Sequence, residues 1–271
     1  MIIGAEPWYR NRDLVSVDRI SDIRKNGFYY YPINPARLGP EPSFAFVREA
    51  ATLAMNKEID AVVTGPISKE KWLSAGIPYP GHTDFLAAHA GNRPHAMLFW
   101  SPDLKVALFT AHLPLRDVFE QLTRPAIGRF IRFVDRELER LFGRKFTFLI
   151  SGLNPHAGEH GHLGSEESDT IIPAIRRAKT GIRILGPYSP DFVFVKALET
   201  KDAVVVSWYH DQGLIPFKLL NRRSGVNLTL GLPYIRTSPD HGTAPEIAGK
   251  GVADSSSMAA ALGLVEQLLG R

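Results

Sequence analysis

Short apolar runs, rich in β-branched and aromatic residues, recur along the chain between glycine, proline and charged residues. "AVVTG" at 61–65 and "AVVVSW" at 203–208 are examples. Runs of roughly four to eight such residues between turn signals are typical of buried strands. The pattern predicts strands at 61–65, 95–100, 106–111, 146–151, 203–208 and 226–232.

Amphipathic helical patterns lie between these runs. In the clearest one, apolar residues step by 4, 3, 4 and 3 positions, so they share one helix face. They are Ile127, Ile131, Val134, Leu138 and Leu141. The arginines and glutamates between them form the solvated opposite face. Helices are predicted at 43–57, 83–90, 125–142, 166–179 and 257–269.

Strands that alternate with helices indicate an α/β fold with a mixed, largely parallel sheet. The 271 residues are enough to bury a sizeable core, and no repeat, low-complexity tract or linker divides them. Residues 1–271 are therefore interpreted as a single unit, built as one large domain or as two interleaved ones.

Composition narrows the class of protein. The chain has no cysteine, which excludes disulfides, Cys-ligated zinc and a thiol nucleophile. The opening "MIIGAEPWYRNRD" carries charge and proline too early for a signal peptide. No apolar run approaches the roughly 18–20 residues that span a bilayer. We therefore expect a soluble, cytoplasmic protein.

The formal net charge is +4, and only the stretch 124–145 concentrates basic residues. Because that stretch fits a solvated helix face, neither a nucleic-acid partner nor a membrane is predicted. A modest excess of positive charge also suits a phosphorylated or carboxylated substrate.

Three histidines follow predicted strands. His112 comes after "VALFTA", His156 after "FTFLISGLNP" and His210 after "AVVVSWY". In open α/β sheets, ligands bind beyond the carboxyl ends of strands. Three imidazoles there would hold one divalent ion, better zinc, cobalt, nickel or iron than calcium, and leave positions open for substrate. Structural histidines would give the same order, so the order alone leaves both interpretations open.

The other histidines lie in different settings. His82 precedes Thr83, a candidate cap for the next helix, and a helix N-terminus is a ready anion site. His241 belongs to "SPDHGTAPEIAGKG", a glycine-rich loop that lets backbone approach a ligand closely. Surface or structural roles are expected for His89, His95, His160 and His162.

Several long motifs carry a family resemblance. The motifs that resemble the 4-hydroxythreonine-4-phosphate dehydrogenase family of vitamin B6 biosynthesis are "DAVVTGPISKE", "YPGHTDFLA", "AHLPLRDV", "GLNPHAGE", "YHDQGLIPFKLL" and "GVNLTLGLPYIRTSPDHGTA". The match runs from about residue 57 to the C-terminus. "HGTAPEIAGKGVAD" is also similar to the adenosine-binding loop of isopropylmalate and isocitrate dehydrogenases, whose fold this family shares. The resemblance implies an α/β/α architecture with two interleaved subdomains around a cleft.

The resemblance also implies an activity. It is the NAD- or NADP-dependent oxidation of the C3 hydroxyl of 4-phosphooxy-L-threonine, followed by decarboxylation to 3-amino-2-oxopropyl phosphate in pyridoxal phosphate biosynthesis. A divalent ion, among zinc, cobalt, magnesium and manganese, would stabilise the alkoxide-like oxygen as hydride leaves. Three imidazole ligands argue against magnesium.

The family's functional residues carry over by motif. Its metal ligands fall on His112, His156 and His210, of which His210 would come from the partner subunit of a homodimer. Lys218 is a candidate proton relay and, with Asp211, a candidate catalytic residue. The implied substrate contacts are His82, Thr83, Lys218, Asn227 and Arg236. The implied cofactor contacts are His241, Gly242, Thr243 and Ala244.

The polar and charged residues in these motifs would bind the substrate or orient other site residues. Lys218 and Arg236 would pair with phosphate and carboxylate, and Asn227 would orient a hydroxyl. Asp211 and Asp240 either orient neighbouring histidines or cap loops. Both roles stay open for these two carboxylates.

The N-terminus departs from the family pattern. Members usually begin with a strand and a "GDPAGIGPE"-like turn, whereas this chain opens at "MIIGAEPWYRN", which resembles the next strand. About thirty N-terminal residues are therefore expected to be absent, and the segment up to about residue 56 is compressed. Such a loss would expose a sheet edge or thin the cofactor site.

Two alternatives to the B6-pathway reaction remain. The same chemistry would act on D-threonate or D-erythronate 4-phosphate, or on an aromatic dihydrodiol, and Lys218 and Arg236 favour an anionic substrate over a neutral one. The second alternative is not an enzyme. In it, the loss of N-terminal residues would leave a non-catalytic module that binds a metal or a nucleotide. Tight NAD binding without turnover would identify that module.

Overall fold

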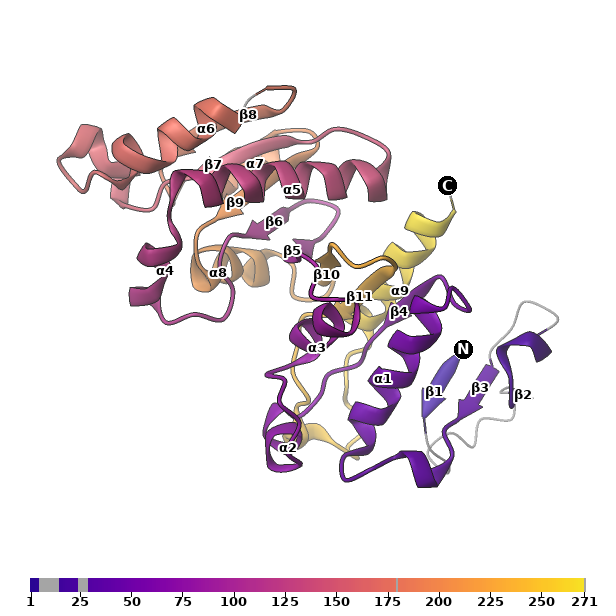
Figure 1. Ribbon diagram of the computed structural model, residues 1–271. Helices are drawn as coiled ribbons and strands as arrows, with labels where there is room; N and C mark the ends of the chain where they lie inside the picture. Colours follow the sequence, from indigo (N-terminus) through magenta and orange to yellow (C-terminus); the bar gives the residue numbers. More distant parts are fainter. Residues whose placement is uncertain (5–14, 24–28, 179, 271) are drawn as a thin grey trace.

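The computed structural model describes residues 1–4, 15–23, 29–178 and 180–270 (Figure 1). In this part of the chain, eight strands form one large sheet and three short strands form a small one. The small sheet has the order β1 (Ile2–Gly4), β3 (Tyr29–Pro32) and β2 (Val15–Ser16). The large sheet has the order β4 (Ala61–Val63), β11 (Ile235–Pro239), β10 (Val226–Leu230), β5 (Ala96–Trp100), β6 (Lys105–Leu108), β9 (Ala203–Ser207), β7 (Thr147–Ser151) and β8 (Arg183–Tyr188).

The large sheet is mixed. Parallel pairings join β4 to β11 and connect β6, β9, β7 and β8, while β11, β10, β5 and β6 pair antiparallel. The predicted α/β class and mixed sheet are confirmed. Because β6, β9 and β7 are adjacent and parallel, their carboxyl ends share one edge of the sheet.

Helices cover both faces of this sheet. Successive residues of a strand point to opposite faces, and Leu98 and Phe99 of β5 accordingly join different core clusters. The first face packs against α5 (Arg124–Phe142), α6 (Ile172–Ala178) and α9 (Ser256–Leu269). The second face packs against α7 (Val193–Glu199) and α8 (His210–Leu220) at one end, and α1 (Pro42–Met55), α2 (Lys69–Ser74) and α3 (His82–His89) at the other.

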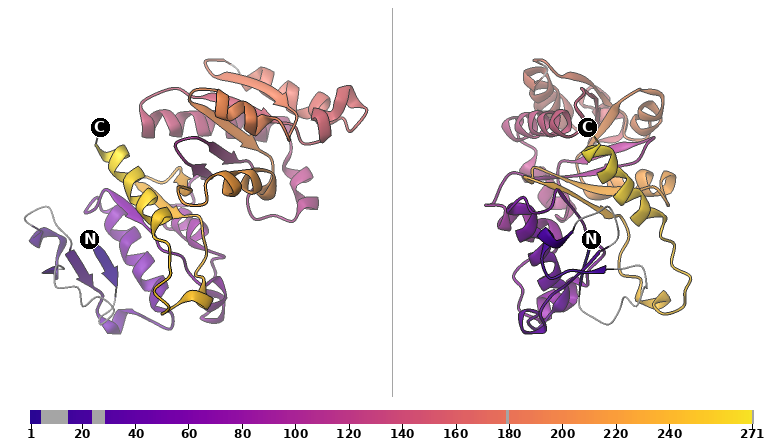
Figure 2. Two further views of the ribbon diagram at one scale, coloured as in Figure 1. Left: turned by 180° about the vertical axis from the view of Figure 1, so that it is seen from behind. Right: turned by 90° about the vertical axis from the view of Figure 1, so that its right-hand side faces the viewer.

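The C-terminal helix returns to the N-terminal half of the molecule. α9 lies beside β4, β10 and β11, in the part of the molecule that also holds the N-terminus (Figures 1 and 2). Thr237 of β11 fixes it by donating from Oγ1 to the carbonyl of Ala261 at 3.0 Å. The two ends of the chain therefore build one lobe, and α4 (Leu115–Gln121) to α8 build the other.

The long helix α5 shows how local sequence sets an element. Thr123 caps its start by accepting from the amide of Ala126, Pro125 occupies the first turn, and Gly143 ends it with a φ of 62°. The predicted apolar face is confirmed, since Ile127, Ile131, Val134 and Leu138 are fully buried.

Several sequence predictions need correction. The predicted helix 166–179 begins as a π-helical turn, Glu167–Ile171, and continues as α6 to Ala178, while residue 179 lies outside the described residues. Thr83 does not cap α3, because the helix already begins at His82 with Gly81 as its cap. Of the opening segment, Ile2–Gly4 forms β1, and residues 5–14 lie outside the described part. The strands and α-helices that were not predicted are β2, β3, β8, β11, α2, α4, α7 and α8.

Candidate active site

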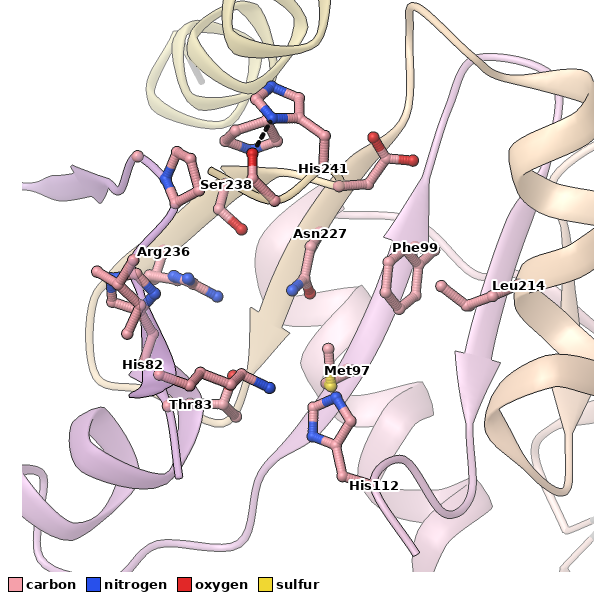
Figure 3. Close-up of a pocket in the computed structure, with 18 of the residues that line it drawn as sticks. His82, Thr83, Met97, Phe99, His112, Leu214, Asn227, Arg236, Ser238 and His241 are labelled. Carbon is pink, nitrogen blue, oxygen red and sulfur yellow. Dashed lines mark hydrogen bonds between the residues drawn. The ribbon is translucent and has the colours of Figure 1, made fainter. Parts of the chain in front are cut away.

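A pocket of about 230 Å³ opens on the second face of the large sheet, between α3 and α8 (Figure 3). Its floor comes from the middle strands β5, β10 and β11. Residues two apart on a strand point to the same face, so the floor takes alternate positions. The floor residues are Met97, Phe99, Asn227, Arg236 and Ser238.

Two helices begin at this pocket. α3 contributes His82, Thr83 and Asp84 from its first turn, and α8 contributes His210 and Lys218. Backbone N–H groups of a first helical turn lack partners within the helix and favour anions. The five predicted substrate contacts all line this pocket.

Arg236 is a fixed cation in the pocket floor. Its side chain is only 2% exposed, and it donates from Nη1 to Thr229 Oγ1 at 3.0 Å and from Nη2 to Thr64 Oγ1 at 2.7 Å. Burial lowers its pKa to about 10, with Tyr234 opposing the shift, so it stays charged at neutral pH. Its Nε is buried and has no hydrogen-bond partner in the described structure. The guanidinium therefore keeps donors for an anionic ligand.

His82 is a neutral imidazole beside this cation. Burial, followed by the charges of Arg236 and Lys69, lowers its pKa to about 3. Its Nε2 is buried without a hydrogen-bond partner among the described residues, and its ring lies 5.6 Å from that of Trp72. Figure 3 shows His82 and Arg236 on one side of the pocket, His112 on the other and Asn227 between them. A ligand between the two sides would satisfy the open nitrogen.

His112 and His210 come together on the far side. Their ring centroids are 5.8 Å apart, and both residues line the pocket. Asp211 Oδ1 lies 2.6 Å from His210 Nδ1, which leaves Nε2 of that ring for a ligand. Burial, then Lys69, then His210 lower the pKa of His112, which favours the neutral form that binds metals. These two imidazoles fit a divalent ion as part of its ligand set.

His156 lies apart from this pair within one chain. It is exposed in η3 (Pro155–Gly161), a turn with positive φ from His156 to His160, and it does not line the pocket. The pKa of Asp191 is lowered chiefly by the hydrogen bond from the Ser189 hydroxyl and in part by the charge of His156. Among the described residues, no three His, Cys, Asp or Glu side chains are close enough to hold a metal ion. His160 and His162 are exposed, as predicted.

The glycine-rich loop after β11 borders the pocket. His241 and Gly242 line it, whereas Thr243 and Ala244 lie beyond the lining residues. A Cβ at Gly242 would meet nothing within 4 Å, so open space for a ligand lies over this backbone. Of the four predicted cofactor contacts, His241 and Gly242 are therefore the two that a ligand in this pocket could reach.

The two aspartates take different roles. Asp211 holds His210, as described, whereas Asp240 accepts from the hydroxyl of Ser257 at 3.3 Å. Burial raises the pKa of Asp240, while Lys218 and Ser257 oppose the shift. A Cβ at Gly225 would come within 2.6 Å of Asp240 Oδ2, so a glycine is needed there. Asp240 therefore ties the pocket floor to the start of α9.

Lys69 is a pocket residue that the sequence did not reveal. It begins α2 and lines the pocket beside Gly81. Its only signal was its place in "DAVVTGPISKE", one of the motifs of the resemblance. A lysine in such a motif is not distinguishable from a solvated surface lysine without the fold.

Comparison with solved structures defines the class. The 4-hydroxythreonine-4-phosphate dehydrogenase of Klebsiella pneumoniae superimposes with a TM-score of 0.80 at 36% identity, over 94% of this chain and 83% of that one. A putative 4-hydroxythreonine-4-phosphate dehydrogenase of Salmonella typhimurium gives 0.83 at 36%, over 98% and 89%. A terephthalate dihydrodiol dehydrogenase of Burkholderia xenovorans, at 24% identity and a TM-score of 0.63, shares the fold. The chain is an α/β enzyme of the dehydrogenase class.

The family follows from the sequence comparisons. The family model described as pyridoxal phosphate biosynthetic protein PdxA matches residues 32–265. The 4-hydroxythreonine-4-phosphate dehydrogenase of Sulfurihydrogenibium sp. is 42% identical over 255 residues, which cover 90% of this chain and 79% of that protein. The chain belongs to the PdxA family. The D-threonate 4-phosphate dehydrogenase of Salmonella typhimurium is also 42% identical, over 95% of this chain and 83% of its own length. Among the described residues, no helix is long and apolar enough to cross a membrane.

Proposed function

We propose that this protein oxidises the C3 hydroxyl of 4-phosphooxy-L-threonine with NAD or NADP, and that the resulting β-keto acid loses carbon dioxide to give 3-amino-2-oxopropyl phosphate. The step would belong to pyridoxal phosphate biosynthesis, in keeping with the family description. The observation that carries the proposal is the pocket itself. It gathers the paired His112 and His210 together with five predicted substrate contacts, namely His82, Thr83, Lys218, Asn227 and Arg236.

The chain's own residues would bind and orient the substrate. Arg236 and Lys218 offer positive charge to the phosphate and carboxylate, and Asn227, whose Oδ1 has no partner in the described structure, would bind a hydroxyl. Lys218 would also relay a proton. Asp211 would keep the His210 ring oriented. A divalent ion held by the histidines and a nicotinamide bound over His241, Gly242, Thr243 and Ala244 would supply alkoxide stabilisation and hydride acceptance.

The complete histidine set would need a homodimer. Because His112 and His210 are paired in one chain and His156 lies apart, a shared site would take His156, rather than His210, from the second subunit. This arrangement exchanges the roles expected from the sequence for His210 and His156. In both arrangements, two copies of the unit 1–271 would form a homodimer whose sites are shared between the subunits.

D-Threonate 4-phosphate is the second candidate substrate, because relatives of equal identity carry that activity in their names. The two substrates differ at C2, where an ammonium replaces a hydroxyl. Asp84 lines the pocket from the first turn of α3, and its carboxylate suits the ammonium group. The pocket charge therefore favours 4-phosphooxy-L-threonine.

The test is NADH formation by the purified protein with 4-phosphooxy-L-threonine and a divalent metal, repeated with chelator. Metal-dependent turnover is expected, with a higher kcat/KM than for D-threonate or D-erythronate 4-phosphate. His112→Ala should abolish it, whereas His162→Ala, an exposed histidine outside the pocket, is the matched control and should retain it. Tight NAD binding without turnover of any of the three substrates would instead establish the non-catalytic module.

A further inference from the structure

Lys69 reaches into the pocket across a glycine. It is the first residue of α2, and its side chain passes over Gly81, the cap residue of α3. A Cβ on Gly81 would lie 3.4 Å from Lys69 Cε and 4.0 Å from Nζ. The missing side chain at Gly81 thus leaves the space that this lysine uses to line the pocket.

Lys69 lines the same pocket as His82 and as the paired His112 and His210. Its charge lowers the pKa of His82, after burial and the charge of Arg236. A cation that lines a pocket of about 230 Å³ together with these residues can contact a ligand that they bind.

The ammonium of Lys69 forms no ion pair with a described residue. No carboxylate lies within salt-bridge distance of Lys69 in the part of the chain that the structure describes, although Asp84 lines the same pocket. An ammonium carries three donors and needs acceptors. Lys69 therefore has donors for a ligand that enters the pocket.

Trp72 fixes the helix that carries this lysine. One turn beyond Lys69, its side chain is fully buried and donates from Nε1 to Ser43 Oγ at 2.8 Å. Its ring packs edge-on against Phe44, at 5.1 Å, and against His82. One indole thus holds α2 and the His82 ring together, and the lysine is presented by an anchored element rather than by a loose loop.

We propose that Lys69 is a substrate-binding residue that contacts an anionic group of the substrate from the α2 side of the pocket. The inference rests on the proposed function, whose substrate carries both a phosphate and a carboxylate. Lys69, Lys218 and Arg236 surround one small pocket and outnumber its carboxylates, Asp84 and Asp240. Arg236 is buried and fixed, whereas a lysine has a flexible stem that adapts to the ligand.

Steady-state kinetics of Lys69→Met test this contact. Loss of one charge-assisted hydrogen bond should raise KM about 10- to 100-fold with kcat changed by less than about 3-fold. Lys69→Arg, which keeps the charge, should recover most of the loss. Lys71→Met is the matched control, because Lys71 is exposed on the same helix and does not line the pocket, and its KM should equal that of the wild type.

A binding experiment separates this proposal from the proposed reaction. Calorimetric titrations of the wild type and Lys69→Met with inorganic phosphate, and then with unphosphorylated D-threonate, need no turnover. Weaker binding of phosphate by the variant places Lys69 at the phosphate, and weaker binding of D-threonate places it at the carboxylate. Indistinguishable titrations of the two proteins with both anions overturn the proposal, whether the anions bind or not. A wild type that binds phosphate through Lys69 but turns over no substrate would overturn only the proposed function.

Discussion

At the residue scale, the half-buried His82, whose Nε2 is fully buried, links the pocket to stability. Its folded-state pKa of about 3 lies below the ordinary histidine value of 6.5, so the unfolded chain binds a proton that the folded one refuses. The folded state is therefore favoured above pH 6.5, and this contribution is lost as the pH falls from 6.5 towards 3. The burial of this imidazole, with the charges of Arg236 and Lys69 as smaller causes, thus makes the stability of the fold sensitive to acid.

We predict that His82→Gln reduces this sensitivity. The free energy of unfolding of the wild type should fall between pH 7 and pH 5 by about 2 kcal/mol more than that of the variant. Denaturant unfolding at both pH values measures the difference. His89→Gln, on the same helix but exposed, should keep the pH dependence of the wild type. Parallel pH profiles for His82→Gln and the wild type would show that His82 is not held neutral.

Single residues also show how far sequence could identify the site. The position of histidines after buried strands selects His112 and His210, because adjacent parallel strands bring their carboxyl ends together. The same rule does not place His156, since the left-handed turn after β7 carries it away from that edge. Lys69 was not predicted as a site residue, because its place in the pocket depends on the packing of Trp72 and on the absence of a side chain at Gly81.

At the element scale, the turn that carries His156 is held in an uncommon conformation. Backbone φ is positive at six consecutive positions from His156 to Gly161, four of which are not glycine. The buried carboxylate of Glu167 braces it by accepting from the amides of Leu153 at 2.7 Å and Asn154 at 2.8 Å. Such strain persists only where surrounding contacts over-determine it. We infer that these contacts keep His156 exposed and oriented.

Substitutions at two glycines of this turn would distinguish the cost of backbone strain from the cost of a steric clash. At Gly158 a Cβ would lie 2.8 Å from Glu167 Oε2 and 3.0 Å from the Gly164 carbonyl, whereas at Gly161 it would meet nothing within 4 Å. Both residues have positive φ. Gly161→Ala should therefore cost about 1 kcal/mol of stability, and Gly158→Ala about 2–4 kcal/mol. Urea unfolding compares them, and equal losses would mean that Glu167 does not brace the turn.

Element prediction succeeded where burial alone decides the pattern. Strands β5, β7 and β9 are buried along their length and read as continuous apolar runs. β11 was missed because its sequence "IRTSP" carries the polar floor of the pocket. α8 was missed because "HDQGLIPFKLL" contains Gly213, whose Cβ would clash with Val106 and Leu108 at 2.8 Å, and Pro216. Local rules thus fail at the elements that build the site.

At the scale of the whole molecule, an apolar surface is exposed on the two helices that cover one end of the second face of the large sheet. The outer sides of α7 and α8 expose large hydrophobic residues, up to 74% for Leu219. Exposed apolar patches of this kind mark interaction sites. The exposed residues are Val195, Leu198, Ile215, Leu219 and Leu220. We propose that a second copy of the chain covers these residues, since the shared site proposed above takes a third histidine from a partner subunit and His210 begins α8.

Mixing of inactive variants tests which histidine crosses between subunits. If His112 and His210 act from one subunit and His156 from the other, a dimer of one His112→Ala and one His156→Ala chain contains one intact site. Random mixing after dissociation and reassembly should then restore about a quarter of wild-type turnover, because half of the dimers are mixed and one of their two sites is complete. His112→Ala mixed with His210→Ala should restore none, since both losses fall on the same side of each site. The reverse outcome, with recovery only in the second mixture, would mean that His210 crosses to the partner despite lying beside His112 in its own chain.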